Sequence, residues 1–305
     1  MCGINGFQGG FQKQLIEQMN GSIIHRGPDN SDFSIYDETA LGHVRLSIID
    51  LSPNANQPLT SSCQQFEIVF NGEIYNFVEL RESLCGQGVN FQSLGDSEVL
   101  LEMWAKYGEK SLEMLDGIFS FAVLDKTTGL LTIVRDHFGV KPLYYAQIDN
   151  GFIFSSEIKA ILQSTEVSRH INFNAVASVV GLLWQAGEST VLEAVKKVPP
   201  GSLIRVQDGQ VKSQERYYTC PSYKGDYSLE ASKEALDRDL VDSVESQLVS
   251  DVEVGAFLSG GLDSSLVCAI AKNKNPEFKK VYSIDIDAEE NKKEGLTEDL
   301  PFAKK

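Results

Sequence analysis

The second residue of the chain is a cysteine, Cys2, and a glycine and an isoleucine follow it. Because residue 2 is small, the initiator Met1 can be removed, which leaves Cys2 with a free α-amine beside its own thiol. The reference pKa is about 7.7–8.0 for an α-amine and about 8.5 for a thiol, so near neutral pH the amine can accept the thiol proton. This pair predicts a nucleophile that needs no histidine. Removal of Met1 is a condition of this chemistry.

Four short motifs rich in polar residues and glycine follow this cysteine. They are His25-Arg-Gly-Pro-Asp29, Arg45-Leu-Ser-Ile-Ile-Asp50, Asn71-Gly-Glu-Ile-Tyr-Asn76 and Gly95-Asp-Ser-Glu98. Each motif alone fits an ordinary turn or a helix cap, and Asp96 is such a cap candidate. Their order after an N-terminal Cys-Gly-Ile is far more specific than any one of them.

A second glycine-rich segment, Leu258-Ser-Gly-Gly-Leu-Asp-Ser-Ser265, lies between an expected strand and an expected helix. Successive glycines before a helix expose backbone N–H groups at the positive end of the helix dipole, which favours an anion. The segment is not a Walker A loop, because it lacks the G-x-x-x-x-G-K-[ST] spacing. A glycine turn without a ligand is the alternative interpretation.

With these motifs the chain resembles the class II glutamine amidotransferases, and it is most similar to the glutamine-dependent asparagine synthetase family. The resemblance covers essentially the whole chain. It implies an α+β N-terminal-nucleophile hydrolase domain with an αββα sandwich. It further implies that a truncated α/β parallel-sheet domain of the ATP-pyrophosphatase type follows.

The resemblance makes Cys2 the nucleophile that attacks the side-chain amide of glutamine. Asn71 and Gly72 match the positions that stabilise the tetrahedral oxyanion, for which a side-chain NH₂ and a backbone N–H are suitable donors. They also count among the glutamine-binding residues.

Three charged residues match the positions that hold the α-carbon groups of the glutamine substrate. Arg45 corresponds to the residue that binds the α-carboxylate, a task suited to a planar fork of donors. Glu73 and Asp96 match the acceptors for the α-ammonium group.

The second glycine-rich segment resembles the SGGxDS pyrophosphate loop, which binds ATP while a carboxylate is adenylated. ATP and Mg²⁺ are therefore the implied cofactors, and Asp263 is the implied Mg²⁺-linked residue. The other positions that match the ATP site are Leu258, Ser259, Gly260, Gly261, Ser264, Ser265 and Ile286, with Leu258 and Ile286 beside the adenine.

The resemblance implies a ligase that hydrolyses glutamine at Cys2 and passes ammonia to an ATP-adenylated carboxylate. The simplest acceptor is aspartate, which gives asparagine, AMP and pyrophosphate. One alternative is an amidotransferase for another carboxylate, such as a uronic acid of a surface polysaccharide. A glutaminase-only or ligand-binding fragment is a second alternative. Dimerisation is common in the family, so a homodimer is compatible with the resemblance.

The elements that must position these residues can be read from hydrophobic patterns in the first region. Alternating β-rich runs predict strands at 66–70, 119–124, 130–134 and 151–154, and helical patterns cover 76–85 and 96–107. Residues 125–129 fit a hairpin turn. Strands that pair locally around a few helices predict a layered α+β domain with a largely antiparallel sheet.

We expect a domain at 1–206, a polar linker at 207–230 and the start of a second domain at 231–305. A helix capped by Ser228, strands at 253–258 and 280–286, and an intervening helix at 262–272 predict one βαβ unit. A parallel sheet needs several such units, so we expect a fragment whose βαβ unit leaves an apolar face uncovered.

Composition argues against a nucleic-acid-binding, secreted or membrane protein. The chain has 305 residues and a formal net charge of −16, which argues against nucleic acid as the main partner. Its five cysteines are scattered and odd in number, which predicts reduced thiols in a cytoplasmic protein. The N-terminus lacks the features of a signal peptide, and no apolar run is long enough to span a membrane. The four histidines have no metal-ligand spacing, so we interpret them as structural.

Overall fold

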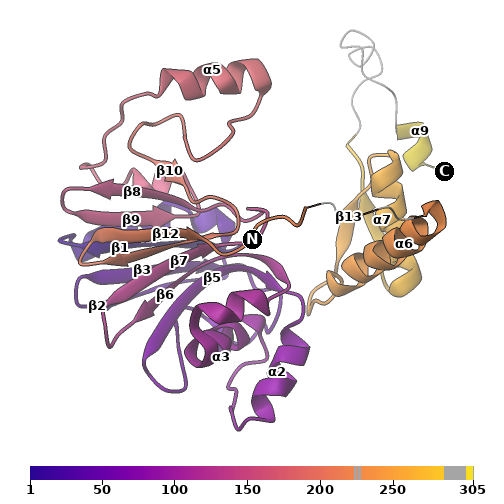
Figure 1. Cartoon of the computed structure of the whole chain (residues 1–305), viewed down its shortest axis with the longest axis horizontal. Coiled ribbons are helices and arrows are strands. Elements are labelled where there is room, and N and C mark those ends of the chain that lie inside the picture. Colours follow the sequence, from indigo (N-terminus) through magenta and orange to yellow (C-terminus); the bar gives the residue numbers. More distant parts are fainter. Residues whose placement is uncertain (223–224, 226–227, 285–299, 305) are drawn as a thin grey trace. The chain divides into compact units, whose positions relative to one another are not determined.

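The computed structural model describes residues 1–222, 225, 228–284 and 300–304. The chain divides into two compact units, Met1–Pro221 and Ser222–Lys305, and each is described by itself (Figure 1). Within the described residues, no helix combines the length and the apolar character that a membrane span requires.

The first unit contains two antiparallel sheets of six strands each. The first sheet has the order β10 (Lys196–Lys197), β8 (Tyr144–Ile148), β9 (Gly151–Ser155), β1 (Gly3–Gly9), β3 (Thr39–Arg45) and β2 (Asn30–Tyr36). The second has the order β12 (Gln210–Arg216), β11 (Ser202–Gln207), β7 (Leu130–Arg135), β6 (Gly117–Asp125), β5 (Phe66–Ile74) and β4 (Leu59–Thr60). Strand β1, which Cys2 immediately precedes, and strand β5, which carries Asn71 and Gly72, lie inside their sheets.

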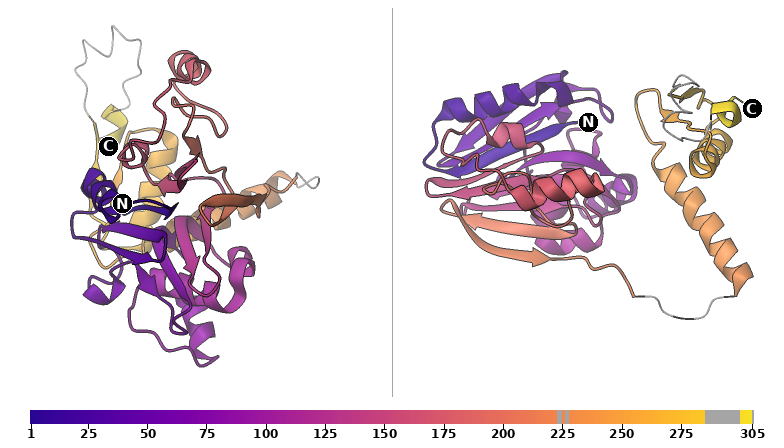
Figure 2. Two further views of the ribbon diagram at one scale, coloured as in Figure 1. Left: turned by 90° about the vertical axis from the view of Figure 1, so that its left-hand side faces the viewer. Right: turned by 90° about the horizontal axis from the view of Figure 1, so that it is seen from above.

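Helices cover the outer faces of the two sheets. The covering helices are α1 (Lys13–Ser22), α2 (Phe77–Cys85), α3 (Asp96–Tyr107) and α4 (Ile158–Ile161), and short 3₁₀ turns are η1 (Ile24–Arg26), η2 (Pro53–Ala55) and η3 (Gly108–Glu113). Helix α5 (Phe173–Leu182) is mostly exposed and stands away from the sheets (Figure 1). Figure 1 shows α2 and α3 beside the second sheet, and the right-hand view of Figure 2 shows α1 along the first.

Three apolar clusters hold these layers together. Ile4 and Phe154 of the first sheet pack with Val69 and Ile204 of the second, so the two sheets stack face to face. The other two clusters lie between the second sheet and α2 and α3, and between the first sheet and α1 and α4. The hydrophobic effect therefore stabilises the predicted αββα sandwich, with burial as its main source of free energy.

The segment predicted as a linker, 207–230, begins inside the second sheet. Gln207 pairs with Gln210, and Asp208 and Gly209 between them have φ angles of 54° and 69°. These angles are typical of a two-residue hairpin turn, for which Asp-Gly is favoured. The polar residues after the turn form the mostly exposed strand β12, and the two units divide only after Pro221.

In the second unit, α6 (Leu229–Ser246), β13 (Gly255–Phe257), α7 (Leu262–Lys274) and β14 (Lys280–Tyr282) precede the short helix α9 (Leu300–Ala303). Ser228 caps α6 by accepting a hydrogen bond from the backbone N–H of Ala231, as predicted. Strands β13 and β14 are parallel and flank α7, so the predicted βαβ unit is confirmed.

We predict that this second unit exchanges its amide hydrogens much faster than the first. Its described buried core consists of Val244, Ala271 and Phe278, while Phe257 and Leu262 are 77% and 82% exposed. So small a core gives a low free energy of local opening. Hydrogen exchange with mass spectrometry checks this, with β5 and β6 as the internal reference. Equal protection of α7 and β6 would contradict the prediction.

Candidate active site

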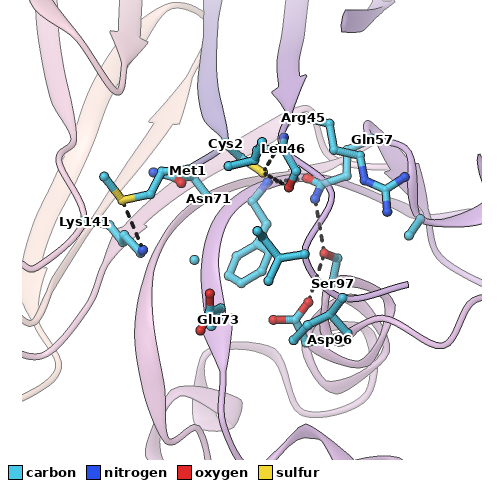
Figure 3. A pocket seen from close by; sticks show the side chains of 15 residues that line it. Met1, Cys2, Arg45, Leu46, Gln57, Asn71, Glu73, Asp96, Ser97 and Lys141 are labelled. Carbon is cyan, nitrogen blue, oxygen red and sulfur yellow. Dashed lines mark hydrogen bonds between the residues drawn. The ribbon is translucent and has the colours of Figure 1, made fainter. Parts of the chain in front are cut away.

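A cavity of about 130 Å³ opens in the first unit where β1, β3 and β5 meet the start of α3 (Figure 3). The structure brings all six predicted glutamine-site residues to it. Its lining comprises Met1, Cys2, Arg45, Leu46, Ile48, Ile49, Ala55, Gln57, Phe70, Asn71, Gly72, Glu73, Asp96, Ser97 and Lys141.

The Cys2 thiol lies at the edge of β1, against the end of β3. Its Sγ is 3.5 Å from the carbonyl oxygen of Leu46, and the backbone N–H of Leu46 donates to Sγ at 3.4 Å. Burial raises the pKa of this thiol and lowers the pKa of the α-amine of Met1. The residue after Cys2 is a glycine, Gly3, because a Cβ at this position would lie only 2.9 Å from side-chain carbons of both Ile23 and Val44.

The His25–Asp29 motif holds the backbone of Cys2 in place. Arg26 donates through Nε to the carbonyl oxygen of Cys2 at 2.9 Å, and through Nη1 to Glu157 at 3.0 Å. Glu157 also pairs with His25 at 2.9 Å and with Lys159 at 3.1 Å. The segment around Glu157, in which the sequence shows no obvious chemistry, thus fixes the nucleophile indirectly.

Asn71 and Gly72 lie side by side in β5. Asn71 is 1% exposed, and its Nδ2 is buried without a hydrogen-bond partner in the part of the chain that the structure describes. A buried donor without a partner lowers the stability of the folded state by about 1–3 kcal/mol, so its presence requires an explanation. Residue 72 must be glycine, because a Cβ there would lie 2.3 Å from the carbonyl oxygen of Ile118.

Two buried side chains fix the backbone immediately before Asn71. Nε2 of His43 lies 3.1 Å from the carbonyl oxygen of Phe70, and the backbone N–H of Phe70 donates to Gln57 at 2.6 Å. Burial lowers the pKa of His43 to about 3, so this ring is neutral and structural, as predicted. Gln57 also donates to Ser97 at 3.2 Å. Neither residue was given a role from the sequence: Ser97 belongs to the Gly95–Glu98 motif, whereas Gln57 lies outside every motif.

Arg45 lies at the far end of β3 and is 5% exposed. Its Nη1 donates to the carbonyl oxygen of Ser52 at 2.8 Å and to Oδ1 of Asn56 at 2.6 Å, while Nη2 donates to the carbonyl oxygen of Asp50. Three of the five guanidinium N–H groups thus form hydrogen bonds with the loop that follows β3.

Glu73 and Asp96 form the acidic side of the cavity (Figure 3). Burial and, less strongly, the charge of Glu73 raise the pKa of Asp96 to about 6, and burial also raises the pKa of Glu73. Asp96 is not the helix cap that its position suggests. Gly95 is the N-cap of α3, and Asp96 instead accepts a hydrogen bond from the backbone N–H of Ile74 at 3.0 Å. Two carboxylates that line the same cavity favour a cation there.

The second predicted site lies in the second unit, at the N-terminus of α7. Oγ of Ser259 lies 2.9 Å from Oγ of Ser264 and accepts the N–H of Gly261 at 3.2 Å, and Gly260 has a φ of 89°. The loop runs from Leu258 through Gly261, and Ser265 and Asp263 lie in the first turn of the helix. Ile286 lies outside the described residues.

No group of three or more potential His, Cys, Asp or Glu metal ligands occurs among the described residues. Asp263 is exposed in the first turn of a 13-residue helix. Mg²⁺ in nucleotide sites is held by one or two carboxylates together with the phosphates, so a single carboxylate at this loop fits that ion.

Comparison with known proteins agrees with this geometry. Residues 1–218 match the family model described as a glutamine amidotransferase domain, and residues 235–305 match the model described as asparagine synthase. Asparagine synthetase [glutamine-hydrolyzing] 1 of Bacillus subtilis (strain 168) is 38% identical over 94% of this chain and 46% of its own length. Asparagine synthetase B [glutamine-hydrolyzing] of Escherichia coli (strain K12) is 36% identical over 86% of this chain and 42% of its own. The chain thus spans about half the length of these relatives.

Among solved structures, the fold is similar to glutamine phosphoribosylpyrophosphate amidotransferase from B. subtilis, with a TM-score of 0.56. The identity is 18%, and the match covers 97% of this chain and 71% of that one. This likeness confirms the N-terminal-nucleophile amidotransferase fold. From its sandwich, its cavity and its family matches, the chain belongs to the glutamine amidotransferase family, with an asparagine synthase segment after the amidotransferase domain.

Proposed function

We propose that the first unit hydrolyses glutamine at Cys2 once Met1 has been removed. The observation that carries the proposal is Nδ2 of Asn71, which has no partner among the residues that the structure describes and is buried in the lining of the same cavity as the Cys2 thiol. An unused donor beside a nucleophile is what an oxyanion requires, because the negative charge appears only in the transition state.

The chemistry begins with transfer of the thiol proton to the α-amine of Cys2. Sγ then forms a bond to the side-chain carbonyl carbon of glutamine, and the carbonyl electrons move onto oxygen, where Asn71 and Gly72 donate to it. The ammonium gives its proton to the leaving NH₂, which departs as ammonia and leaves a thioester. Water then attacks the thioester, with the amine as base, and releases glutamate and the thiol.

Recognition of the substrate follows from the charges at the cavity walls. Glu73 and Asp96 suit the α-ammonium group, and the Arg45 guanidinium retains N–H groups beyond the three already engaged for the α-carboxylate.

Glutamine affinity should fall as the pH decreases below about 6. Because the pKa of Asp96 is raised to about 6, its carboxylate is protonated below that pH and loses its attraction for an ammonium group. Calorimetric titration of an inactive Cys2→Ala chain should show about tenfold weaker binding for each pH unit below 6. An Asp96→Asn variant should bind weakly at every pH. A wild-type affinity that is constant from pH 5 to 7 would exclude this role.

For the whole protein we propose a glutamine-dependent carboxylate-amide ligase. Its amidotransferase domain supplies ammonia, and its synthetase domain adenylates a carboxylate, with aspartate as the simplest acceptor. The loop around Ser259, Gly260 and Gly261 would hold the pyrophosphate of ATP through backbone N–H groups, and Asp263 would hold Mg²⁺. Bound Mg²⁺ neutralises phosphate charge. Both B. subtilis and E. coli relatives carry the name asparagine synthetase.

Aspartate-dependent formation of AMP by the full-length protein separates this ligase from one that uses another carboxylate. If glutaminase activity is retained while aspartate elicits no AMP, a different acceptor, such as a uronic acid, is favoured.

The glutaminase proposal is tested by trapping the nucleophile. The purified chain is incubated with an electrophilic diazoketone analogue of glutamine and then digested for mass spectrometry, while glutamate release is measured in parallel. We expect one label on Cys2, only in molecules that lack Met1, and complete loss of glutamate release. Labelling of Cys63 or Cys85 with unchanged activity would contradict the proposal.

A further inference from the structure

Lys141 lies in the cavity lining together with Met1 and Cys2 (Figure 3), and the proposed mechanism does not use it. The residue is only 6% exposed, although it carries an ammonium group. Its Nζ lies 3.4 Å from Sδ of Met1, and it forms no ion pair within the described part of the chain. Removal of Met1 eliminates that contact and leaves the Lys141 ammonium in the same cavity lining as Cys2, the new N-terminal residue.

The loop after β7 holds Lys141 rigidly. Asp136 is 1% exposed and accepts hydrogen bonds from the backbone N–H groups of Val140 and Lys141, both at 2.9 Å. Arg135 donates through Nε to the carbonyl oxygen of Lys141 at 2.8 Å. No chemical motif marks residues 135–141 in the sequence. In the structure, these hydrogen bonds hold the backbone that places Lys141 in the cavity lining.

Charged groups act on this corner of the cavity from every element packed around it. They are Glu73 of β5, Asp96 of α3, Arg45 of β3, Arg26 of η1 and Asp136 at the base of the loop. Burial lowers the pKa of Lys141, and Glu73 opposes that effect, so the carboxylate helps to keep the ammonium charged. In turn, Lys141 adds to burial and to Arg26 in lowering the pKa of the α-amine of Met1, the N-terminal amine before processing.

We propose that Lys141 is an electrostatic positioning residue that lets the amine–thiol pair of processed Cys2 lose its first proton near neutral pH. This inference rests on the proposed glutaminase function. The pair is inert while it holds both protons, as an ammonium beside a thiol. A nearby cation repels the ammonium and attracts a thiolate, so it favours loss of one proton to solvent whichever atom the remaining proton occupies. Lys141 acts through Cys2 and does not itself react.

The test compares Lys141→Met, which keeps the length but removes the charge, with Lys141→Arg, which keeps the charge. In Met1-free chains, the rate of Cys2 alkylation by iodoacetamide is followed against pH without glutamine, and kcat/KM for glutamine is followed in parallel. We expect the midpoint of both profiles to rise by about one pH unit in Lys141→Met. Below the midpoint this corresponds to about tenfold slower alkylation, and the profiles converge at high pH.

Lys141→Arg should retain the wild-type midpoint, and so should Lys110→Met, which removes an exposed lysine outside the cavity lining. An unchanged midpoint in Lys141→Met overturns the inference, as does an equal loss at every pH, which would indicate a packing role alone. Lys141→Gln takes its place if the methionine variant does not fold. A wild-type chain that releases no glutamate refutes the proposed function, whereas the alkylation profiles still decide the role of Lys141.

Discussion

Replacing Cys2 with alanine should lower glutamate release at least about a thousandfold, because the variant lacks the atom that forms the thioester. The α-amine remains in that variant, so any residual rate reports water activated by the amine in the same cavity. The measurement is glutamate formed from glutamine by chains whose N-terminus has been verified by mass spectrometry. Cys85→Ala, which removes an exposed cysteine at the end of α2, should retain full activity.

A chain with an uncleaved residue before Cys2 should show a loss of the same size. Its thiol is intact, but its amine is an amide and can no longer accept the thiol proton. An added residue would also occupy the space in which Met1 now lies beside Lys141. If this blocked chain hydrolysed glutamine at the normal rate, some other group would have to be the base, and the N-terminal mechanism would be wrong.

The parts of the fold that hydrophobic periodicity predicted are those with a one-sided or fully apolar pattern. Strands β5, β6, β7 and β9 and helix α3 contain the predicted segments, and α2 begins one residue later than predicted, after its N-cap Asn76. Strand β1 was not predicted, because Gly3, Gly6 and Gly9 weaken its pattern. The structure explains Gly6, since a Cβ there would lie 2.4 Å from the carbonyl oxygen of Ala40. Close approach of three neighbouring strands leaves no periodic signal in the sequence.

The six residues of the proposed glutamine site, which line one cavity, could be named from the sequence only because their motifs resemble a family. The surroundings could not, since they depend on contacts between distant segments. Gln57 reaches Phe70 and Ser97, Glu157 reaches Arg26, and the loop around Asp136 delivers Lys141. The interpretation of Asp96 as a helix cap was wrong for the same reason. A capping pattern depends on neighbouring residues, whereas the hydrogen bond from Ile74 to Asp96 joins residues that are distant in the sequence.

Replacing Asn71 with alanine should lower kcat about 100- to 1000-fold, which corresponds to about 3–4 kcal/mol of transition-state stabilisation, and should leave KM within a few fold. The structure explains why kcat should change much more than KM. Nδ2 has no partner in the described part of the free protein, so its donor is used only when the oxyanion forms. The folded state should tolerate the change well, because the substitution also removes an unsatisfied buried donor.

Two further variants make this prediction sharp. Asn71→Asp keeps the shape but points a carboxylate at the oxyanion, so its kcat should fall at least as far as that of the alanine variant. Ser120 is opposite Asn71 in the β5–β6 pairing, and its buried hydroxyl oxygen also lacks a partner among the described residues, but it does not line the cavity. Ser120→Ala should therefore keep kcat within about twofold, because it perturbs the same packing without removing an oxyanion donor. If Asn71→Ala instead raised KM and left kcat unchanged, Asn71 would be a ground-state binding residue, and the oxyanion would have to be stabilised by other donors.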